Sequence, residues 1–443
     1  MKFFKTFYTL FTLYTLSIFY TFFTLSSCTF TKRISKQANR VLLKDSAIKQ
    51  GHIGISIYEP ATGKYWYNYD AEKYFIPPSN TKLFTLYAGM KYLGDSLVGL
   101  RYEIVNDTVA DIYPTGDPTL LHIDFTKQPV LDFLKKQHTI IINRSYRSFK
   151  SLGHGWAWDD HQENYMIPRV QFPMFENLLK IKWINKDSII VYPKYFSKKT
   201  VEATDLSEGF QLIKEFGENN FTLLNGNTKR ITSPFESDTD ADINLLSDTL
   251  NNNNIFYSNG IHPHDNKKLK VIHSQPTDSL FKPMMHNSDN FFAEQTLLMA
   301  SNEHLGYMSD VDMIDTLLKN DLKDVPQKPK WVDGSGLSRY NLFTPKDFVY
   351  ILNKIKNEFS VARIENILPT GGTGTLSDYY KKDSSFIYAK TGTLSNNCAL
   401  SGYLITKKNK QLIFSVLVNN YQTPAAPVRR AVEKLLQSIR ENY

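Results

Sequence analysis

The two ends of the chain carry strand patterns, although more than 300 residues separate them. His52–Tyr58 and Lys64–Tyr69 are strand candidates on either side of the turn Glu59–Gly63, which predicts a hairpin. Near the other end, three further segments predict strands: Ser385–Ala389, Ala399–Thr406 and Gln411–Val418. We therefore expect one antiparallel sheet whose strands come from distant parts of the chain.

Helical patterns accompany these strands. Pro77 and Pro78 suit a helix entry, because proline lacks only a donor that the first helical turn leaves unpaired. Ser79–Leu93 then carries apolar residues at helical spacing. Pro427–Glu441 is an amphipathic closing helix. The expected fold class is α+β, with an antiparallel sheet flanked by helices.

The middle of the chain has a different texture. A chain of 443 residues is too long for one compact domain, and its 42% hydrophobic content is globular. Residues 97–266 read as short strands separated by Asn/Asp/Thr-rich turns, which predicts one or two inserted β-rich domains. The sheet domain is then expected in two parts, residues 46–96 and 267–443.

The first 28 residues are interpreted as an export signal. Lys2 and Lys5 precede residues 7–25, which contain no charged side chain. Leu25-Ser26-Ser27-Cys28 resembles the lipobox of bacterial lipoproteins, in which Cys28 is acylated and becomes the first mature residue. An uncleaved anchor and a plain secreted form are the alternatives, and all three place the protein outside the cytoplasm. Residues 29–45 are expected to form a polar, basic tether.

Composition excludes several classes of protein. Two cysteines cannot form a disulfide framework or a cysteine zinc site. His262 and His264 lie in a Pro/Asn-rich stretch that reads as a solvated loop, and H-E-x-x-H is absent, so we expect no metal site there. The net charge of +8 is a mild excess that favours anionic surroundings, and no nucleic-acid-reading motif accompanies it.

Ser79 and Lys82 form the first of three short motifs that carry chemistry. On a helix, positions i and i+3 lie on one face about 5–6 Å apart, so the amine can reach the hydroxyl. A serine needs a base to become a nucleophile, and an amine whose pKa is lowered by burial can serve. The spacing alone is weak, because it recurs at Ser46 and Ser279. Only Ser79 follows a proline pair and precedes a strongly apolar helix.

The second motif is Ser288-Asp289-Asn290, and the third is Lys390-Thr391-Gly392-Thr393. Each has an ordinary structural reading, as a helix N-cap for the second motif and a strand-to-turn boundary for the third. In the functional reading, Ser288 relays a proton between Lys82 and the leaving group. The cation and two hydroxyls of the third motif, at the end of strand 385–389, can grip a carboxylate on an edge strand. Gly392 leaves room there for a substrate chain.

Together and in this order, the motifs S-x-x-K, S-x-N and K-T-G form a specific signature. They resemble those of the penicillin-recognising serine enzymes, which include D-alanyl-D-alanine peptidases and serine β-lactamases. Ser79 and Ser288 are 209 residues apart. This spacing is similar to that of the class C low-molecular-mass penicillin-binding proteins, a family with domains inserted between these motifs. Further stretches resemble the same family: Gly116–Leu120, Trp156–Asp160, Asp333–Arg339, Leu368-Pro369 and Gly374–Leu376.

The resemblance covers most of the chain from about residue 47 onward and thins between residues 184 and 255. Tyr379 departs from it, because an arginine is expected after the Gly-Thr-Leu element. That departure puts a secondary contact in doubt but leaves the three motifs intact. Arg339 reads as part of a tight turn beside the site, and it is the next candidate for holding a carboxylate.

The resemblance implies a serine-type D-alanyl-D-alanine carboxypeptidase or endopeptidase that acts on peptidoglycan stem peptides through an acyl-enzyme. It also implies that penicillins bind covalently and that no cofactor or metal takes part. Backbone N–H groups of Ser79 and Thr393 would form the oxyanion hole, and Asn290 would orient Lys82 and donate to the substrate's backbone. The implied catalytic residues are Ser79, Lys82, Ser288 and Asn290, and the implied substrate-binding residues are Lys390, Thr391, Gly392 and Thr393.

Two alternatives share these motifs. A serine β-lactamase of class A would supply a deacylating glutamate from an E-x-x-L-N stretch, which this chain lacks. A non-catalytic envelope scaffold could keep the fold and use its inserts for binding, but the intact motifs argue against a dead site. The balance of carboxypeptidase and endopeptidase action, the third residue of the stem peptide and the choice of membrane stay open. The expected location is a lipoprotein of the bacterial envelope that faces the periplasm.

Overall fold

A five-stranded antiparallel sheet joins the two ends of the chain, in the order β14-β15-β16-β1-β2. The computed structural model describes residues 32–144, 148–185, 188–203, 211–224, 230–261 and 269–443. The strands of this sheet are β1 (His52–Glu59), β2 (Lys64–Tyr69), β14 (Ile387–Leu394), β15 (Asn397–Ile405) and β16 (Gln411–Asn419). Since β1 pairs with β16 and every neighbouring pair is antiparallel, the expected sheet is confirmed.

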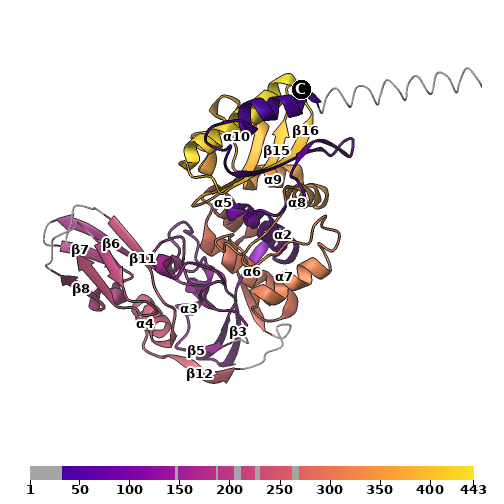
Figure 1. Cartoon of the computed structure of the whole chain (residues 1–443). Coiled ribbons are helices and arrows are strands. Elements are labelled where there is room, and N and C mark those ends of the chain that lie inside the picture. Colours follow the sequence, from indigo (N-terminus) through magenta and orange to yellow (C-terminus); the bar gives the residue numbers. More distant parts are fainter. Residues whose placement is uncertain (1–31, 145–147, 186–187, 204–210, 225–229, 262–268) are drawn as a thin grey trace, which may run out of the picture.

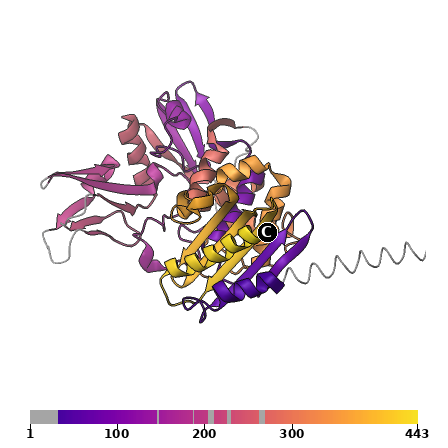
Figure 2. The same ribbon diagram turned by 90° about the horizontal axis from the view of Figure 1, so that it is seen from above.

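Helices cover both faces of this sheet, which explains why the consecutive residues Ile53–Ile57 of the inner strand β1 are all buried. On one face lie α2 (Lys82–Tyr92), α5 (Thr277–His286), α6 (Asn290–Leu305), α7 (Asp310–Lys319), α8 (Pro345–Glu358) and α9 (Val361–Ile367). On the other face α10 (Ala425–Asn442) crosses the strands (Figure 2). The predicted helix at 79–93 begins as a 3₁₀ turn, η2 (Pro78–Thr81), before α2 continues it.

A second helical segment lies beside α10 and corrects the prediction of a tether. Residues 32–38 are helical and continue into η1 (Asn39–Leu43). Ile34, Ala38 and Leu42 recur every four residues and are fully buried in the core beneath α10. Residues 32–45 are therefore part of the folded domain. The prediction of a tether was wrong because the basic residues of this segment alternate along the helix with apolar residues that are buried. The predicted export signal, Cys28 and residues 29–31 lie outside the described residues.

The insert contains a five-stranded mixed sheet and two three-stranded sheets, at the lower left of Figure 1. The first sheet is formed by β3 (Ser96–Asn106), β4 (Val109–Pro114), β5 (Thr139–Arg144), β12 (Ile255–Ile261) and β13 (Lys270–Pro276). The smaller sheets are formed by β6 (Leu178–Asn185), β7 (Ser188–Tyr192), β11 (Arg230–Pro234), and by β8 (Thr200–Ala203), β9 (Gln211–Lys214), β10 (Phe221–Leu224). The remaining elements of the insert are α3 (Pro129–Leu134), α4 (Thr239–Leu250), η3 (Trp158–Asp160), η4 (Phe175–Asn177) and η5 (Lys194–Lys198).

The insert ends later than the predicted boundary at residue 266. Strand β13 pairs antiparallel with β3, the first strand of the insert, with Lys270 opposite Tyr102. The chain enters the insert after Asp95 and leaves it before Thr277. A hydrogen bond joins these two points, because Thr277 N donates to Asp95 O at 2.9 Å. Sheet pairing therefore places the insert at residues 96–276. Turn-rich texture could not locate this end, because β13 is itself polar and largely exposed.

Within the described ranges, none of the helices is long and apolar enough to cross a membrane. Two short 3₁₀ turns, η6 (Gly374–Leu376) and η7 (Lys381–Phe386), precede the edge strand β14. That edge faces η2 and the start of α6 and leaves the three motifs close to one another.

Candidate active site

Ser79 and Lys82 lie at the junction of η2 and α2, as their spacing predicted. Lys82 is fully buried, and its Nζ donates to Ser79 Oγ at 3.0 Å. The same amine donates to Asn290 Oδ1 at 2.6 Å and to the backbone carbonyl of Ser335 at 2.7 Å. Three acceptors therefore fix the amine beside one hydroxyl.

Burial lowers the pKa of Lys82 to about 8, because the charged form loses its hydration. The carboxylates of Asp333, Glu294 and Asp289 act in the opposite direction and limit this fall. A lysine with this pKa has a neutral fraction near neutral pH, which an ordinary surface lysine lacks. The site therefore contains an amine that can accept the proton of a serine.

Asn80 fixes η2 against the edge of the sheet. In the amide orientation that satisfies both of its ends, Asn80 Nδ2 donates to Lys390 O at 2.8 Å and its Oδ1 accepts from Ser401 Oγ at 2.6 Å. Gly392 lies beside this contact, and a Cβ added there would be 3.0 Å from Ser79 N. A glycine at this position thus lets β14 approach the nucleophile's backbone closely.

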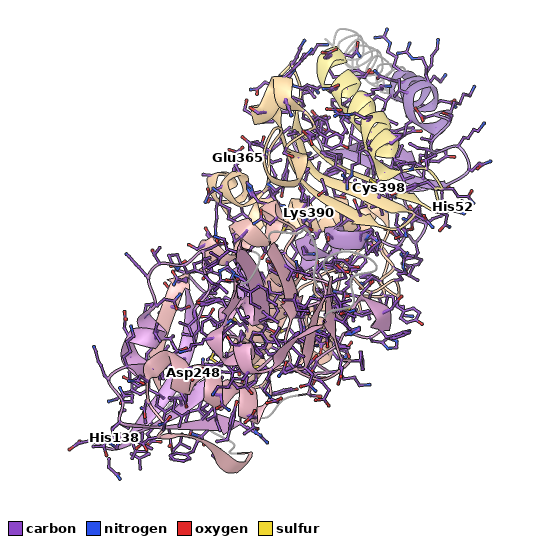
Figure 3. All side chains as sticks on the ribbon, turned by 90° about the vertical axis from the view of Figure 1, so that its left-hand side faces the viewer. His52, His138, Asp248, Glu365, Lys390 and Cys398 are labelled. Atoms are coloured by element: carbon purple, nitrogen blue, oxygen red, sulfur yellow. The ribbon has the colours of Figure 1, made fainter. Side chains whose placement is uncertain are left out.

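The second and third motifs meet at Lys390, which is fully buried and is labelled in Figure 3. Its Nζ donates to Ser288 Oγ at 2.9 Å and to Thr391 O at 2.8 Å. Burial first, and then the positive charges of Lys82 and Arg429, hold the pKa of Lys390 well below its usual range. The described hydrogen bonds therefore link Ser288 to Lys390 and include none between Ser288 and Lys82, which the predicted relay required.

The Ser288-Asp289-Asn290 segment serves as a helix cap and as part of the site. Asp289 is the N-cap of α6 and accepts from Phe292 N at 2.8 Å. Ser288 has a φ of 59°, in the left-handed region that a residue with a side chain seldom adopts. This conformation turns Ser288 toward Lys390 while Asn290 begins the helix beside Lys82. Asn290 Nδ2 donates to the carbonyl of Tyr165 at 2.7 Å, so one of its two N–H donors is already used by the insert.

The third motif lies inside β14 rather than at the end of a strand, because β14 continues to Leu394. It does lie on an edge, since β14 is the outermost strand. Ala389 N donates outward to Pro369 O at 3.0 Å, and N–H groups along an edge strand alternate in direction. The N–H groups of Thr391 and Thr393 therefore point outward too, where a substrate strand or an oxyanion can accept from them.

Arg429 is a site residue that the sequence did not reveal. It comes from α10, is partly buried, and its Nη2 donates to Thr393 Oγ1 at 2.5 Å. It also lines a small apolar cavity together with Thr391 and Tyr379. Arg429 therefore places a guanidinium in the same cavity as Tyr379, the position at which an arginine is expected. Nothing in the amphipathic pattern of α10 distinguished Arg429 from the solvent-exposed Arg430.

The predicted turn around Arg339 forms a wall of the site. Arg339 Nη1 donates to Ser395 O at 3.2 Å, at the turn between β14 and β15. Gly336 in the same turn has a φ of 83°, and a Cβ there would lie 2.0 Å from Pro78 O. The glycine therefore allows this turn to pack directly on the residue before the nucleophile.

A buried network of ion pairs and hydrogen bonds fixes the turn that contains Ser335 and Gly336. Arg169 Nε donates to Glu294 Oε2 at 2.8 Å, and its Nη1 lies 2.8 Å from Asp310 Oδ2. Glu294 Oε1 accepts from Ser335 N at 2.7 Å, which orients the residue whose carbonyl holds Lys82. Asp333 accepts from Gly336 N at 2.8 Å. Since Arg169 belongs to the insert, the insert helps to position the lysine.

Residues of the three motifs and of the turn around Arg339 surround an open cleft of about 470 Å³. It is lined by Ser79, Gly155, Ala157, Asp160, Tyr165, Ser288, Asn290, Gly336, Leu337, Arg339, Thr393, Leu394 and Ser395. A nucleophile, a buried amine, outward N–H donors and a cation beside two threonines meet at one strand edge. This arrangement can attack a carbonyl, stabilise the oxyanion and hold an adjacent carboxylate.

No cluster of three or more His, Cys, Asp or Glu side chains suited to a metal occurs in the ranges that the structure describes. His262 and His264 lie outside those ranges. The polar side chains that line the cleft present hydroxyl groups, one amide, one guanidinium and the single carboxylate of Asp160, rather than the imidazole, thiolate or paired carboxylate ligands typical of metal centres.

Comparisons with known proteins agree with this geometry. The family model described as D-Ala-D-Ala carboxypeptidase 3 (S13) matches residues 35–439. D-alanyl-D-alanine carboxypeptidase DacB of Haemophilus influenzae is 23% identical over 422 residues, which cover 85% of this chain and 87% of that protein. The D-alanyl-D-alanine carboxypeptidase of Actinomadura sp. R39 is 22% identical, over 87% of this chain and 80% of that protein.

Among solved structures, the fold is similar to penicillin binding protein 4 (DacB) from Haemophilus influenzae. The TM-score is 0.74 at 18% identity, and the match covers 92% of this chain and 99% of that one. The same protein complexed with a β-lactam gives a TM-score of 0.70 at 17% identity, over the same shares of the two chains.

Proposed function

The chain belongs to the D-Ala-D-Ala carboxypeptidase 3 (S13) family, and from that premise we propose that Ser79 is the nucleophile of its active site. Its activity is that of a penicillin-binding, serine-type D-Ala-D-Ala carboxypeptidase/endopeptidase that acts on peptidoglycan peptides. One observation carries the proposal. The buried amine of Lys82, with its pKa lowered, donates to the hydroxyl of Ser79 at 3.0 Å.

In the proposed reaction, neutral Lys82 takes the proton of Ser79 while Oγ attacks the carbonyl carbon of the penultimate D-alanine. The negative charge that forms on the carbonyl oxygen is stabilised by the N–H groups of Ser79 and Thr393. The C–N bond then breaks, and the terminal D-alanine leaves as an amine once its nitrogen is protonated. Water attacks the ester in a second step and frees Ser79.

The proton for the leaving amine comes through the Ser288 hydroxyl in this proposal. Ser288 Oγ accepts from Lys390 at 2.9 Å, so Lys390 keeps the Ser288 hydroxyl hydrogen free to point toward the cleft. Ser288 then recovers a proton from Lys82, which comes within hydrogen-bonding distance of it once the substrate is bound, and Lys82 returns to its neutral form. Asn290, which accepts from Lys82 at 2.6 Å, holds the amine in place during this exchange.

The terminal carboxylate is held by Thr391, Thr393 and Arg429 in this proposal. Arg429 donates to Thr393 Oγ1, and a carboxylate that replaced or shared that contact would gain a charge-assisted hydrogen bond. Gly392 keeps the strand edge free of side-chain bulk, so the substrate can lie along β14. A grip of this kind favours substrates with a free chain end.

Covalent labelling with a fluorescent penicillin tests the assignment of Ser79. We expect a stable adduct on the peptide that contains Ser79, because the glutamate that deacylates class A β-lactamases is absent from this sequence. Ser79→Ala should abolish labelling, and labelling that survives this change contradicts the assignment. Rapid loss of label from the unmodified protein favours a β-lactamase.

Lys82→Ala should abolish both labelling and turnover on a D-Ala-D-Ala peptide while the melting temperature changes little. A large fall in the melting temperature would instead make Lys82 a structural residue. Lys49→Ala is the matched control, because Lys49 ends the S-x-x-K spacing that starts at Ser46 and is exposed outside the lining of the cleft.

We also propose that Cys28 carries a lipid that anchors the protein in the bacterial envelope, facing the periplasm. The Leu25-Ser26-Ser27-Cys28 sequence after an uncharged run supports this proposal. A diacylglyceryl thioether together with an N-acyl chain gives stable anchoring, so Cys28→Ser should release the protein from membranes washed with high salt or stall its processing. Full retention of a normally processed variant after the high-salt wash contradicts the anchor.

A further inference from the structure

The helical segment at residues 32–44 has two chemically opposite faces. Ile34, Ala38 and Leu42 face the core, whereas the cations recur on the opposite side of the helix at the same spacing. Residues 32–44 contain no acidic residue, and all five of their cations are exposed: Lys32, Arg33, Lys36, Arg40 and Lys44.

Two more cations join this surface from the turn between β15 and β16. Lys407 and Lys408 are exposed, and their N–H groups donate to Arg440 O and Tyr443 O at the end of α10. Tyr443 is buried in the same core as Ile34 and Leu42, so the N-terminal helix and this turn both lie at the end of α10. We call the surface formed by Lys32, Arg33, Lys36, Arg40, Lys44, Lys407 and Lys408 the basic face.

The charges of the basic face are not compensated by neighbouring acids. Among the described residues, none of the ion pairs includes any of the seven cations. Asp45 and Glu441 are the acidic side chains in or directly beside these segments that are not buried. Lysines elsewhere on the molecule often have partners, as Lys346 does with Glu72. A one-sided surface of this kind attracts an extended anionic partner.

From this arrangement we infer that the basic face docks on a membrane surface rich in anionic phospholipids. Its cations are exposed, and those of the helix lie on the side opposite the buried Ile34, Ala38 and Leu42. The helix at residues 32–43, which carries most of these cations, lies at the top of Figure 1, and the insert lies at the opposite end of the molecule. Docking therefore directs the insert and the cleft away from the lipid and toward the peptidoglycan substrate.

The proposed lipid anchor supplies a second argument, and this step rests on the proposed function. Lys32 comes four residues after Cys28, a length of chain that spans at most about 14 Å. An anchor at Cys28 would hold the first cations within one or two Debye lengths of the lipid headgroups. Electrostatic attraction to anionic lipids would then fix the orientation of a protein that the anchor alone leaves free to turn.

Vesicle binding tests the basic face without the lipid. The chain from residue 28 with Cys28→Ser contains every described helix and strand, so it keeps the described fold. We expect it to sediment with vesicles of phosphatidylglycerol and phosphatidylethanolamine, to be released by high salt, and not to bind phosphatidylcholine vesicles. Lack of binding to the anionic vesicles at low salt overturns the inference.

Two matched variants separate the face from net charge. Lys36→Gln with Arg40→Gln removes two cations from the basic face and should weaken vesicle partitioning roughly 30-fold. Lys135→Gln with Lys136→Gln removes the same charge from exposed positions beside His138, which Figure 3 labels at the far end of the insert. This control should bind like the unchanged protein. Equal losses in both variants overturn the inference, because they make binding a matter of net charge alone.

Isolated peptidoglycan sacculi provide the competing partner. If the basic face variant loses binding to sacculi but keeps binding to vesicles, the partner is the polymer and the membrane assignment is wrong. The vesicle result is independent of the anchor, since a high-salt wash removes protein that is held by the basic face alone, so that fractionation of Cys28→Ser after this wash tests the lipid. If the lipid anchor or the basic face fails its test, the other proposal is therefore unaffected.

Discussion

At the scale of single residues, Lys82 determines how the rate should depend on pH. Only the neutral amine can take the proton of Ser79, and its pKa is lowered to about 8. The rate of acylation by penicillin should therefore rise about tenfold per pH unit below that value and level off above it. Stopped-flow labelling at pH values on both sides of 8 measures this profile. A rate that is flat across this interval would show that Lys82 is not the titrating base.

The same pKa shift has a consequence for stability. The unfolded chain keeps an ordinary lysine pKa near 10.5, so between pH 8 and pH 10.5 it binds a proton that the folded protein does not. The contribution of Lys82 to the free energy of unfolding should therefore rise as the pH increases through this window. Urea denaturation of the protein and of Lys82→Met at two pH values isolates this contribution. A difference between the two proteins that does not change with pH contradicts it.

The carboxylate grip can be separated from acyl transfer. Charge-assisted hydrogen bonds are worth about 1.5–3 kcal/mol, so Thr393→Val or Arg429→Gln should reduce kcat/KM for a D-Ala-D-Ala peptide roughly 10- to 100-fold. A peptide amidated at its C-terminus should be affected much less, because it offers no carboxylate. The measurement is the ratio of activities on acid and amide. Thr393→Val is suitable because valine keeps the β-branched shape that strands favour.

Arg430→Gln is the control for Arg429, since it removes the same charge one residue further along α10. Arg430 pairs with Glu433 and lies over the ring of Tyr379, outside the cleft. A ratio that moves as much for Arg430→Gln as for Arg429→Gln would indicate a general electrostatic effect. A ratio that moves for neither would direct attention to Arg339 and Lys390.

Sequence patterns identified the side chains of the site better than its backbone contacts. The spacing of Ser79 and Lys82 predicted their contact, because a helix places i and i+3 on one face. The carbonyls of Ser335 and Tyr165, which receive hydrogen bonds from Lys82 and Asn290, carry no sequence signal. Any residue type can present a carbonyl, so only the fold reveals these acceptors.

At the scale of elements, the inner strands β1, β15 and β16 were predictable because both of their faces are buried. Residues such as Ile53–Ile57 form continuous apolar runs bounded by turns. Strand β14 extends further than predicted, since its third motif is polar yet pairs with β15 up to Leu394 opposite Asn397. Pairing of backbone groups, rather than side-chain hydrophobicity, extends the strand there.

The helical segment at residues 32–43 was not predicted, because its many cations made the segment read as polar although it also contains an apolar stripe. A chain that starts at residue 46 should be less stable than one that starts at residue 32. Burial of an isoleucine or leucine is worth about 1.5–3 kcal/mol, so losing Ile34 and Leu42 should cost roughly 3–6 kcal/mol. Chemical denaturation of the two chains measures the difference. If the two chains have the same free energy of unfolding, residues 32–45 act as a tether and do not stabilise the domain.

At the scale of the whole molecule, the insert contributes to the site rather than merely occupying a loop. Tyr165 accepts from Asn290, and Trp156 Nε1 donates to Asp333 at 2.9 Å. These contacts cross from the insert to the sheet domain. They could not be predicted from the sequence because the partners are more than 100 residues apart and each stretch reads locally as a turn.

Arg169 is the strongest of these links. It is almost fully buried, pairs with Glu294 of α6 and with Asp310 of α7, and lies over the ring of Trp156. Removal of one member of a buried ionic network leaves its partners charged and unpaired. Arg169→Met should therefore lower the free energy of unfolding by roughly 3–5 kcal/mol. Arg101→Met is a comparison, because Arg101 also comes from the insert and pairs with one helix residue, Glu303, far from Lys82.

The two variants should differ in activity more than in stability. Without Arg169, Glu294 no longer has a partner that fixes it on Ser335 N, and the carbonyl that holds Lys82 is free to shift. The rate of penicillin acylation should therefore fall for Arg169→Met. The pH at which this rate levels off should also shift, because the carbonyl of Ser335 no longer holds the Lys82 amine in one position. Arg101→Met should keep the acylation rate and the profile of the unchanged protein at temperatures where it stays folded. If both variants lose activity only in proportion to the fraction unfolded, the insert stabilises the sheet domain without positioning its lysine.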